Sequence, residues 1–321
     1  MPAAVAERVV AVVVAWNRRE LLVEGLRALS AQTRPVDQIV VIDNASTDGS
    51  SEAAREAVPE AQVVVLPRNT GGAGGFAAGI ERALNVHHAD LVWLMDDDTV
   101  PTDTALAELI AVREASGREA AVLASKVVWT DGRPHPMNMP RVNPFASAGV
   151  RAAAEAHNCY PIRSASFVSV LIDASAVRAV GLPIADYFLW NDDFEFTTRL
   201  LRGRRGYLCE RSVVVHKTKV FGSTDVDPGP RFRLEVRNKL WLLLRSPGLA
   251  PLERAVYAGS TVARWVRTVA RSHDRATLLR GLVDGAREGL GARPRSSAAV
   301  LFDAPDVAAG AARIDAAAGR P

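Results

Sequence analysis

The sequence predicts an α/β fold built on a mostly parallel sheet, and two observations support this prediction. Apolar, strand-like runs alternate with helix-like patterns through the first hundred residues, as in successive βαβ units. Polar residues collect directly after these runs, where an open α/β sheet binds its ligands. The chain has 321 residues, of which 48% are hydrophobic and 23% charged, which suits one large packed domain with or without a smaller appended one.

The first predicted strand, Val9–Ala15, is an unbroken apolar run typical of a strand buried on both faces. It follows Arg8 but leads straight into Asn17-Arg18-Arg19 without a small-residue cleavage site, which argues against a signal peptide. Leucines at helical spacing then predict a helix over residues 20–31. The alternation continues with a strand at 39–42, a helix at 50–57, a strand at 63–66, a helix at 74–86 and a strand at 91–95.

Beyond Pro101 the pattern loosens. Residues 130–157 are rich in Pro, Gly and Asn and predict a long functional loop. The later predicted elements are a strand at 167–172, a helix at 192–201, short strands at 207–209 and 213–215, and helices within 251–290. We therefore expect a catalytic domain over 1–220, a basic and mainly helical region over 221–295, and a poorly ordered tail over 296–321.

Charge is distributed unevenly along the chain. Residues 1–198 carry 16 Lys and Arg against 25 Asp and Glu, whereas residues 199–295 carry 21 against 8. The basic second part is either a solvated helical face or a contact with an anionic surface. Cys159 and Cys209 form no C-x-x-C motif, and the best apolar run has eight residues against the roughly 20 that a membrane span needs. These features predict a reducing, cytoplasmic location.

Asp96-Asp97-Asp98 is the sharpest chemical motif. The three carboxylates directly follow the predicted strand at 91–95, and local residues cannot neutralise all of them. Such hard oxygen ligands suit Mg²⁺ or Mn²⁺, which usually bridge to a substrate phosphate. The alternative interpretation is an acidic turn before Pro101.

A second acidic cluster, Trp190-Asn191-Asp192-Asp193-Phe194-Glu195, stands at the start of the predicted helix at 192–201. Acidic residues there are favoured by the helix dipole, but the preceding apolar residues indicate a pocket edge where a carboxylate would act as a general base. In a helix, Asp192 and Glu195 share a face while Asp193 points about 100° away.

Two further features are less specific. His216 ends a predicted strand, and a lone histidine there is more often structural than a ligand. Gly71-Gly72-Ala73-Gly74-Gly75 overlaps a dinucleotide fingerprint but follows the third predicted strand instead of the first, so we interpret it as a backbone turn close to a ligand.

Taken in order, these motifs resemble family-2 glycosyltransferases of the GT-A fold over residues 9 to about 217. The resemblance is carried by Val9–Ala15 with Trp16-Asn17-Arg18, the segment 41–50, the segment 68–75, Asp96-Asp97-Asp98 and the cluster at 190–195. The glycine loop and the segments 227–232 and 236–239 are most similar to actinobacterial galactofuranosyltransferases that begin galactan synthesis on a polyprenyl-pyrophosphate-linked disaccharide. The implied fold is a Rossmann-like, mostly parallel mixed sheet flanked by helices, with a C-terminal helical extension.

The resemblance implies a role for each candidate residue. Asp193 would be the catalytic base of an inverting transfer. The metal, Mn²⁺ or Mg²⁺, would be held by Asp96, Asp98 and His216. The nucleotide-sugar donor would be bound by Arg18, Asp43, Asn69, Asp96 and Asp97. The polyprenyl-pyrophosphate-linked glycan acceptor would be bound by Trp190, Asp192, Glu195, Arg231 and Arg237.

The implied donor is UDP-galactofuranose. Arginines around residue 231, together with Lys239, would meet the acceptor pyrophosphate. The arginines near Trp265 would rest on anionic lipid, which would place the enzyme peripherally at the inner face of the cell membrane. Nothing resembles a nucleic-acid-binding motif, so no nucleic acid is expected as a partner.

Three alternatives stay open. A rhamnosyltransferase that uses dTDP-rhamnose on a similar lipid-linked acceptor would share many of these motifs. A nucleotidyltransferase would also use paired aspartates, but it usually carries a Gly-rich loop after its first strand, where this chain has Trp16-Asn17-Arg18-Arg19. A non-catalytic sugar-nucleotide-binding protein is the third, and the retained Asp192-Asp193 pair argues modestly against it.

Overall fold

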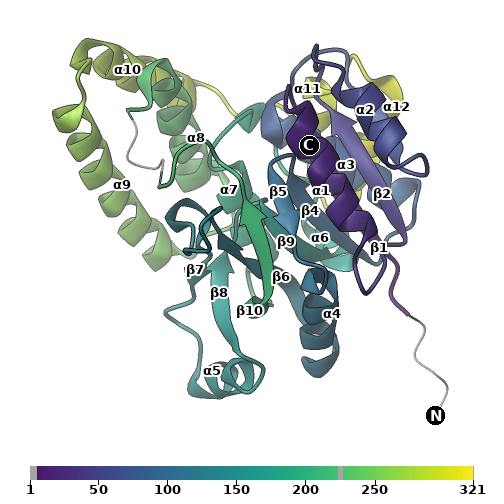
Figure 1. Cartoon of the computed structure of the whole chain (residues 1–321). Coiled ribbons are helices and arrows are strands. Elements are labelled where there is room, and N and C mark those ends of the chain that lie inside the picture. Colours follow the sequence, from purple (N-terminus) through teal and green to yellow (C-terminus); the bar gives the residue numbers. More distant parts are fainter. Residues whose placement is uncertain (1–5, 223–226, 321) are drawn as a thin grey trace.

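The computed structural model describes residues 6–222 and 227–320 (Figure 1). Ten strands in this part of the chain form one mixed sheet in the order β3-β2-β1-β4-β9-β6-β10-β8-β7, and β5 pairs with the end of β10. The strands are β1 Val9–Ala15, β2 Gln38–Asp43, β3 Gln62–Val65, β4 Leu91–Asp96, β5 Thr99–Pro101, β6 Ala120–Val128, β7 Arg141–Val142, β8 Cys159–Ser164, β9 Ser169–Asp173 and β10 Arg205–His216.

Helices cover both faces of this sheet, and further helices follow towards the C-terminus of the chain. The helices of the sheet-forming part are α1 Arg19–Ser30, α2 Ser50–Ala57, α3 Gly71–Asn85, α4 Ala105–Ala115, α5 Ala148–Glu155, α6 Ala174–Val180 and α7 Asp192–Leu200. The later helices are α8 Phe232–Arg245, α9 Pro251–Arg271, α10 Arg275–Gly291, α11 Ser297–Val300 and α12 Pro305–Ala317. Short 3-10 turns occur at Pro136–Asn138, Ala185–Tyr187 and Gly229–Arg231.

The predicted α/β alternation of the first hundred residues is confirmed. Strands β1 to β4 pair in parallel in the order β3-β2-β1-β4, so their carboxyl ends meet at one edge. The two short strands predicted at 207–209 and 213–215 are parts of the single strand β10, which has an irregular register between Cys209 and Val213. The sequence pattern missed α4 and β6, and the predicted long loop at 130–157 contains the short elements β7 and α5.

The alternation of side chains along β1 explains the two layers of the core. Val10, Val12 and Val14 pack with α3 on one face, whereas Val9 and Val13 pack with α1 on the other. All of these valines are buried, as expected for a strand covered on both sides. The predicted layered architecture therefore holds around the first strand.

Helices α8, α9 and α10 stand together beside the sheet, away from α1, α2 and α12 (Figure 1). Close packing of α10 on α8 depends on a glycine, because a Cβ at Gly285 would lie 2.4 Å from the carbonyl oxygen of Arg233. The predicted helical character of residues 251–290 is confirmed. None of the helices in the described ranges is long and apolar enough to span a membrane.

The prediction of a poorly ordered tail over 296–321 is wrong for the residues that the structure describes. Helices α11 and α12 pack against α3, and they place Val300, Leu301, Val307 and Ile314 in the core shared with β1 and β4. The Ala- and Gly-rich composition indicated disorder, but these small side chains allow a close helix approach. Gly310 lies directly against the side chain of Glu81, where a Cβ would clash.

Candidate active site

The acidic motif and His216 come together at the carboxyl ends of the strands. Asp96 is the last residue of β4, and the short strand β5 pairs antiparallel with the end of β10, with His216 opposite Thr99. This pairing sets the imidazole beside the acidic turn, and His216 Nε2 lies 2.9 Å from Asp98 Oδ1. Ligand atoms of Asp96, Asp98 and His216 all lie within 4.8 Å of one another. The structure thus groups the three predicted metal ligands.

The hydrogen bonds around His216 fit a divalent cation at this cluster. His216 Nδ1 lies 2.8 Å from Asn138 Oδ1, so the proton of a neutral ring belongs on Nδ1 and the Nε2 lone pair faces Asp98. Asp98 Oδ1 is buried without a hydrogen bond of good geometry in the described part of the chain. Two lone pairs facing each other at 2.9 Å repel unless a cation or a proton lies between them. An Asp-Asp-His set of this kind suits Mn²⁺ or Mg²⁺.

The ionisation of the acidic turn reflects this crowding. Burial, together with the charge of Asp98, raises the pKa of Asp96 to about 6. Burial also raises the pKa of Asp97 to about 7, although the Trp16 amide and Arg18 oppose the shift. For Asp98, His216 and Arg18 outweigh burial and hold the pKa below its ordinary value. Carboxylates this close need positive charge to remain ionised together.

Arg18 and Asp97 join the end of β1 to the acidic turn. Asp97 Oδ2 accepts a hydrogen bond of 2.9 Å from the Trp16 amide, and Arg18 forms ion pairs with Asp97 and Asp98. The guanidinium therefore already neutralises part of the cluster at the edge where the strands end. These contacts keep Arg18 and Asp97 within the crevice predicted for the donor.

The ends of β2 and β3 lie at the same edge of the sheet. Asp43, which is 1% exposed, accepts a hydrogen bond of 2.8 Å from the Ser46 amide. Asn69 caps the first amide of the glycine loop, with 2.7 Å from its Oδ1 to the nitrogen of Gly71. The loop itself is helical: α3 begins at Gly71, three residues earlier than predicted. Asp43 and Asn69 thus border the N-terminus of α3, where backbone amides favour an anion.

A strained loop leads into the second acidic cluster. Phe188, Trp190 and Asn191 all have positive φ angles, which non-glycine residues rarely adopt. The loop packs so closely on α3 that a Cβ at Gly71 would lie 2.0 Å from the carbonyl oxygen of Phe188. Asn238 of α8 holds it from the other side, with Nδ2 donating at 2.9 Å to the carbonyls of Tyr187, Leu189 and Trp190.

The three acidic residues of α7 differ in exposure and in partners. Asp192 is buried, and Asp193 is partly exposed, with its Oδ1 2.6 Å from the Phe194 amide. Burial raises the pKa of Asp193, while Lys239 and Arg141 oppose the shift. Asp193 also raises the pKa of Asp96 through its charge, so the two carboxylates are close enough to interact.

Two residues predicted to bind the acceptor have structural contacts instead. The Glu195 carboxylate is 1% exposed, is paired with Arg199 at 3.0 Å and accepts a hydrogen bond of 2.7 Å from Ser246, so it faces away from Asp193. Arg237 donates to the carbonyls of Asp186 and Tyr187 and stacks on Trp241. The guanidinium therefore supports the strained loop. Arg231 is exposed at the start of α8, and Trp190 is half-buried in the strained loop itself.

Comparison with known proteins identifies the family. Residues 10–164 match the family model described as glycosyl transferase family 2. Over 265 residues the chain is 31% identical to the galactofuranosyltransferase GlfT1 of Mycobacterium tuberculosis (strain ATCC 25618 / H37Rv), with 77% of this chain and 85% of that relative covered. The chain belongs to glycosyl transferase family 2.

Solved structures with the same fold include two glycosyltransferases. Staphylococcus aureus TarS 1–349 in complex with UDP-GlcNAc has a TM-score of 0.60 at 14% identity, with 98% of this chain and 92% of that chain covered. GalNAc-T7 with UDP, GalNAc and Mn²⁺ has a TM-score of 0.55 at 14% identity, with 80% and 54% covered. The predicted GT-A fold with C-terminal helices is thus confirmed for this family-2 glycosyltransferase.

Sequence reasoning missed two residues that contact the site of this glycosyltransferase. Asn138 orients His216, and Arg141 lies next to Phe194, the residue after Asp193. Both belong to the predicted loop at 130–157. The length of this loop was the one feature of the sequence that indicated a functional role for it. Neither residue stands at a characteristic sequence distance from the acidic motifs, because only the folding of the sheet brings this loop close to them.

Proposed function

We propose that this glycosyltransferase moves galactofuranose from UDP-galactofuranose to a polyprenyl-pyrophosphate-linked glycan, with inversion at the anomeric carbon. One observation carries the proposal: a cluster that can hold a cation lies at the carboxyl ends of the strands, and a separate carboxylate, Asp193, is close enough to Asp96 to interact with it electrostatically. Transfer needs both parts, since one supports a departing diphosphate and the other activates a hydroxyl. The identity to a galactofuranosyltransferase supports the choice of donor.

The chemistry assigned to each group follows from its surroundings. A divalent cation on Asp96, Asp98 and His216 would neutralise the negative charge that develops on the departing UDP. Asp193 accepts the proton of the acceptor hydroxyl as its oxygen bonds to the anomeric carbon and the bond to the diphosphate breaks. Burial strengthens Asp193 as a base by raising its pKa. Attack from the face opposite the diphosphate inverts the centre, and no covalent enzyme intermediate is required.

The donor and acceptor can be tested together. The protein is incubated with Mn²⁺, a synthetic lipid-linked disaccharide acceptor, and either UDP-galactofuranose or dTDP-rhamnose, and the product is identified by mass spectrometry and NMR. The proposal expects a galactofuranosyl product of inverted configuration. Consumption of dTDP-rhamnose with UDP-galactofuranose left intact would replace it with the rhamnosyltransferase alternative, and binding of donor without turnover would indicate a non-catalytic protein.

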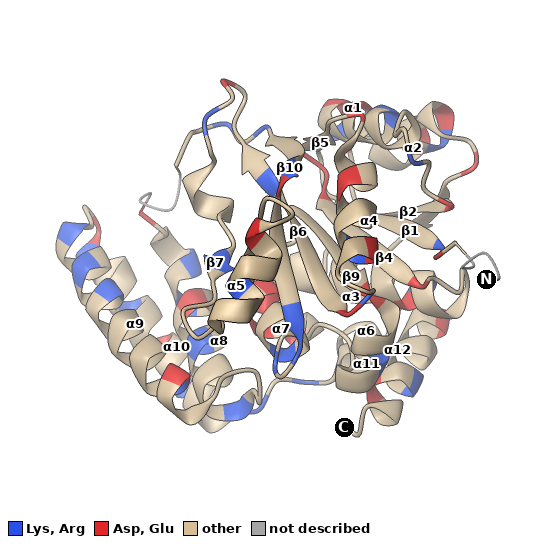
Figure 2. Cartoon of the chain, turned by 90° about the horizontal axis from the view of Figure 1, so that it is seen from below, with Lys and Arg blue, Asp and Glu red and all other residues tan. Residues whose placement is uncertain are grey.

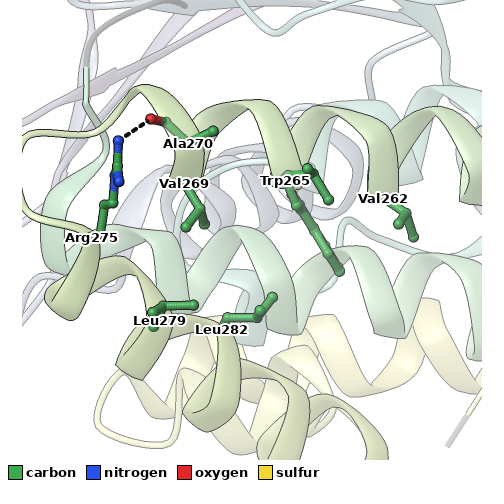
Figure 3. A pocket seen from close by; sticks show the side chains of 8 residues that line it. Val262, Trp265, Val269, Ala270, Arg275, Leu279 and Leu282 are labelled. Carbon is green, nitrogen blue, oxygen red and sulfur yellow. Dashed lines mark hydrogen bonds between the residues drawn. The ribbon is translucent and has the colours of Figure 1, made fainter.

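The C-terminal helices are proposed to rest on the anionic membrane that carries the acceptor. Figure 2 shows basic residues along α9, and the basic residues of α9 and α10 are all arginines. A groove of about 500 Å³ between these helices is lined mostly by apolar side chains, including Trp265, Val269 and Leu282 (Figure 3). Apolar side chains that are 51–67% exposed flank it on both helices: Leu252, Val256, Val262, Val266, Leu279, Val283 and Leu290. Apolar stripes bordered by arginines match the chemistry of an anionic lipid surface.

Vesicle flotation tests this contact. Binding to vesicles that contain anionic lipid should exceed binding to neutral vesicles, weaken with salt, and fall in the double variant Val266→Glu/Val283→Glu. Val86→Glu, at an exposed position after α3, is the matched control and should bind as the wild type does. Equal binding to neutral vesicles, or concentration-dependent dimerisation that the double variant abolishes in place of vesicle binding, would contradict the proposal.

A further inference from the structure

Two cations without a carboxylate partner lie beside Asp193. Lys239 of α8 is 5% exposed, and its Nζ lies 4.7 Å from the centre of the Phe194 ring. Arg141 of β7 places its Cζ 5.4 Å from the same ring and 5.7 Å from the ring of Tyr257 on α9. Among the described residues, neither side chain forms a hydrogen bond or an ion pair. A buried amine and a guanidinium thus share one aromatic ring next to the proposed base.

Two carboxylates interact with Lys239, and of these Glu235 is already engaged, whereas Asp193 is the proposed base. Glu235 faces Lys239, but it accepts a hydrogen bond of 2.6 Å from Asn191 and pairs with Arg264. Arg163, also in this region, is neutralised by its own partner, Glu253. Lys239 and Arg141 together carry two positive charges against the single negative charge of Asp193, so one positive charge lacks a counterpart there. Burying an uncompensated ammonium is costly, and burial lowers the pKa of Lys239 to about 8.

The position of the pair relative to the donor site decides which anion it suits. Asp96 interacts electrostatically with Asp193 and with Arg18, and Asp193 interacts in turn with Lys239 and Arg141. Asp193 is therefore close to the donor cluster and to the two cations. Tyr257, which contacts both Phe194 and Arg141, belongs to α9, the helix that carries the exposed apolar stripe. An anion held here would sit between the base and the lipid-facing helices.

We propose that Lys239 and Arg141 form a subsite for the diphosphate of the acceptor, between the hydroxyl activated by Asp193 and the hydrocarbon directed to α9. Its identification as acceptor diphosphate rests on the proposed function, whereas its anion-binding chemistry does not. The Phe194 ring holds both cations in place through its face, and the diphosphate supplies the negative charge that the protein lacks there. The subsite selects a lipid-diphosphate acceptor over a neutral glycoside.

A pair of acceptors with the same glycan tests the subsite, one on a prenyl diphosphate and the other on a neutral alkyl chain. The ratio of their kcat/KM values is measured in the wild type, Lys239→Met, Arg141→Gln and Lys239→Arg. Loss of one charge-assisted contact should lower the preference for the diphosphate acceptor roughly ten- to hundredfold, with the KM for UDP-galactofuranose unchanged. Lys239→Arg should restore most of it. Arg211→Gln, at an exposed position on β10, is the control and should keep the wild-type ratio.

A binding measurement separates this inference from the proposed function. Geranyl diphosphate is titrated calorimetrically into protein saturated with UDP and Mn²⁺, so that the donor site is filled. Binding that weakens in Arg141→Gln and Lys239→Met supports the subsite even if no galactofuranosyl transfer occurs. Transfer with a wild-type acceptor ratio in both variants overturns the subsite while leaving the function intact. Arg141 is exposed, so its variant remains informative if Lys239→Met fails to fold.

Discussion

Replacing Asn238 by alanine should impair turnover more than its effect on stability explains. Its side-chain amide, which is fully buried, donates to three carbonyls of the loop that carries Trp190. Each such hydrogen bond contributes about 1 kcal/mol net, so Asn238→Ala should lower the free energy of unfolding by about 1–3 kcal/mol. The loop contains three non-glycine residues at positive φ, each of which costs about 1–3 kcal/mol of strain that its surroundings must offset.

Without the Asn238 contacts the loop should relax, and Asp193 at its end should lose its alignment with the acceptor hydroxyl. A displacement of about 1 Å can cost roughly 100-fold in rate, so we expect kcat to fall by about 10- to 100-fold. The KM for the donor should stay near the wild-type value, because the predicted donor residues lie at the ends of β1 to β4 and outside this loop. Asn238→Asp keeps the shape but turns an oxygen toward the carbonyls, so it should be at least as damaging.

Gln32 provides a matched control for this experiment. It is also a buried amide, with Nε2 bound to the carbonyls of Ala28 and Thr102 and Oε1 bound to the Leu106 amide, remote from α7. Gln32→Ala should therefore lower the Tm by a similar amount while kcat, measured well below the Tm, stays normal. Equal Tm losses with wild-type kcat in both variants would refute the positioning role of Asn238.

The remaining predictions concern the base, the metal, the buried lysine and the tail. Asp193→Asn should lower kcat by about 10²–10⁴-fold with donor affinity nearly unchanged, whereas a dead Asp192→Asn beside an active Asp193→Asn would show that the other carboxylate is the base. Chelation should abolish transfer and remove the stabilisation of the protein by UDP with Mn²⁺, measured as Tm; full activity in excess chelator would exclude the metal role. The acceptor KM should rise as the pH rises through about 8, because Lys239, which faces Glu235, Arg264, Arg141 and Asp193, then loses its proton. Lys239→Arg should move this rise to higher pH, and an unchanged profile would contradict the assignment. Deleting residues 296–321 should leave little folded protein by circular dichroism, since four buried apolar side chains contribute about 1.5–3 kcal/mol each against a total stability of about 5–15 kcal/mol.

The parts of the site that follow from local pattern could be predicted from the sequence. The strand ending at Asp96 is a continuous apolar run, and parallel pairing with β1 places its end at the same edge of the sheet as Asp43 of β2. His216 is different, because it reaches Asp98 only through the antiparallel pairing of β5 with β10. The histidine alone did not indicate a metal ligand, and its assignment came from family resemblance.

Residues whose roles depend on tertiary partners could not be assigned from position. Glu195 stands two residues from Asp193, yet Arg199 and Ser246 turn its carboxylate into a structural group. Arg237 looked like a phosphate ligand because of its charge, but its Nη2 group donates to the carbonyls of Asp186 and Tyr187. In both cases the residue type correctly indicated a charged group that binds a partner. Only the packing determined which partner that group binds.

The late part of the chain completes the active site that the first 220 residues begin. The segment that leads into the strained loop is fixed by Asp315, which accepts a hydrogen bond of 2.9 Å from the Leu182 amide, and by Ser297, which lies 3.2 Å from the Ala185 amide. Arg295 pairs with Asp186 in the same segment, and Asn238 holds the residues that follow. The backbone before Asp193 is therefore held by α8, α11 and α12 as much as by the sheet. A division at residue 220 separates the proposed donor-binding motifs from the later helices in sequence. It also cuts through the contacts that hold the backbone before Asp193, the proposed base, so we expect catalysis to require both parts folded together.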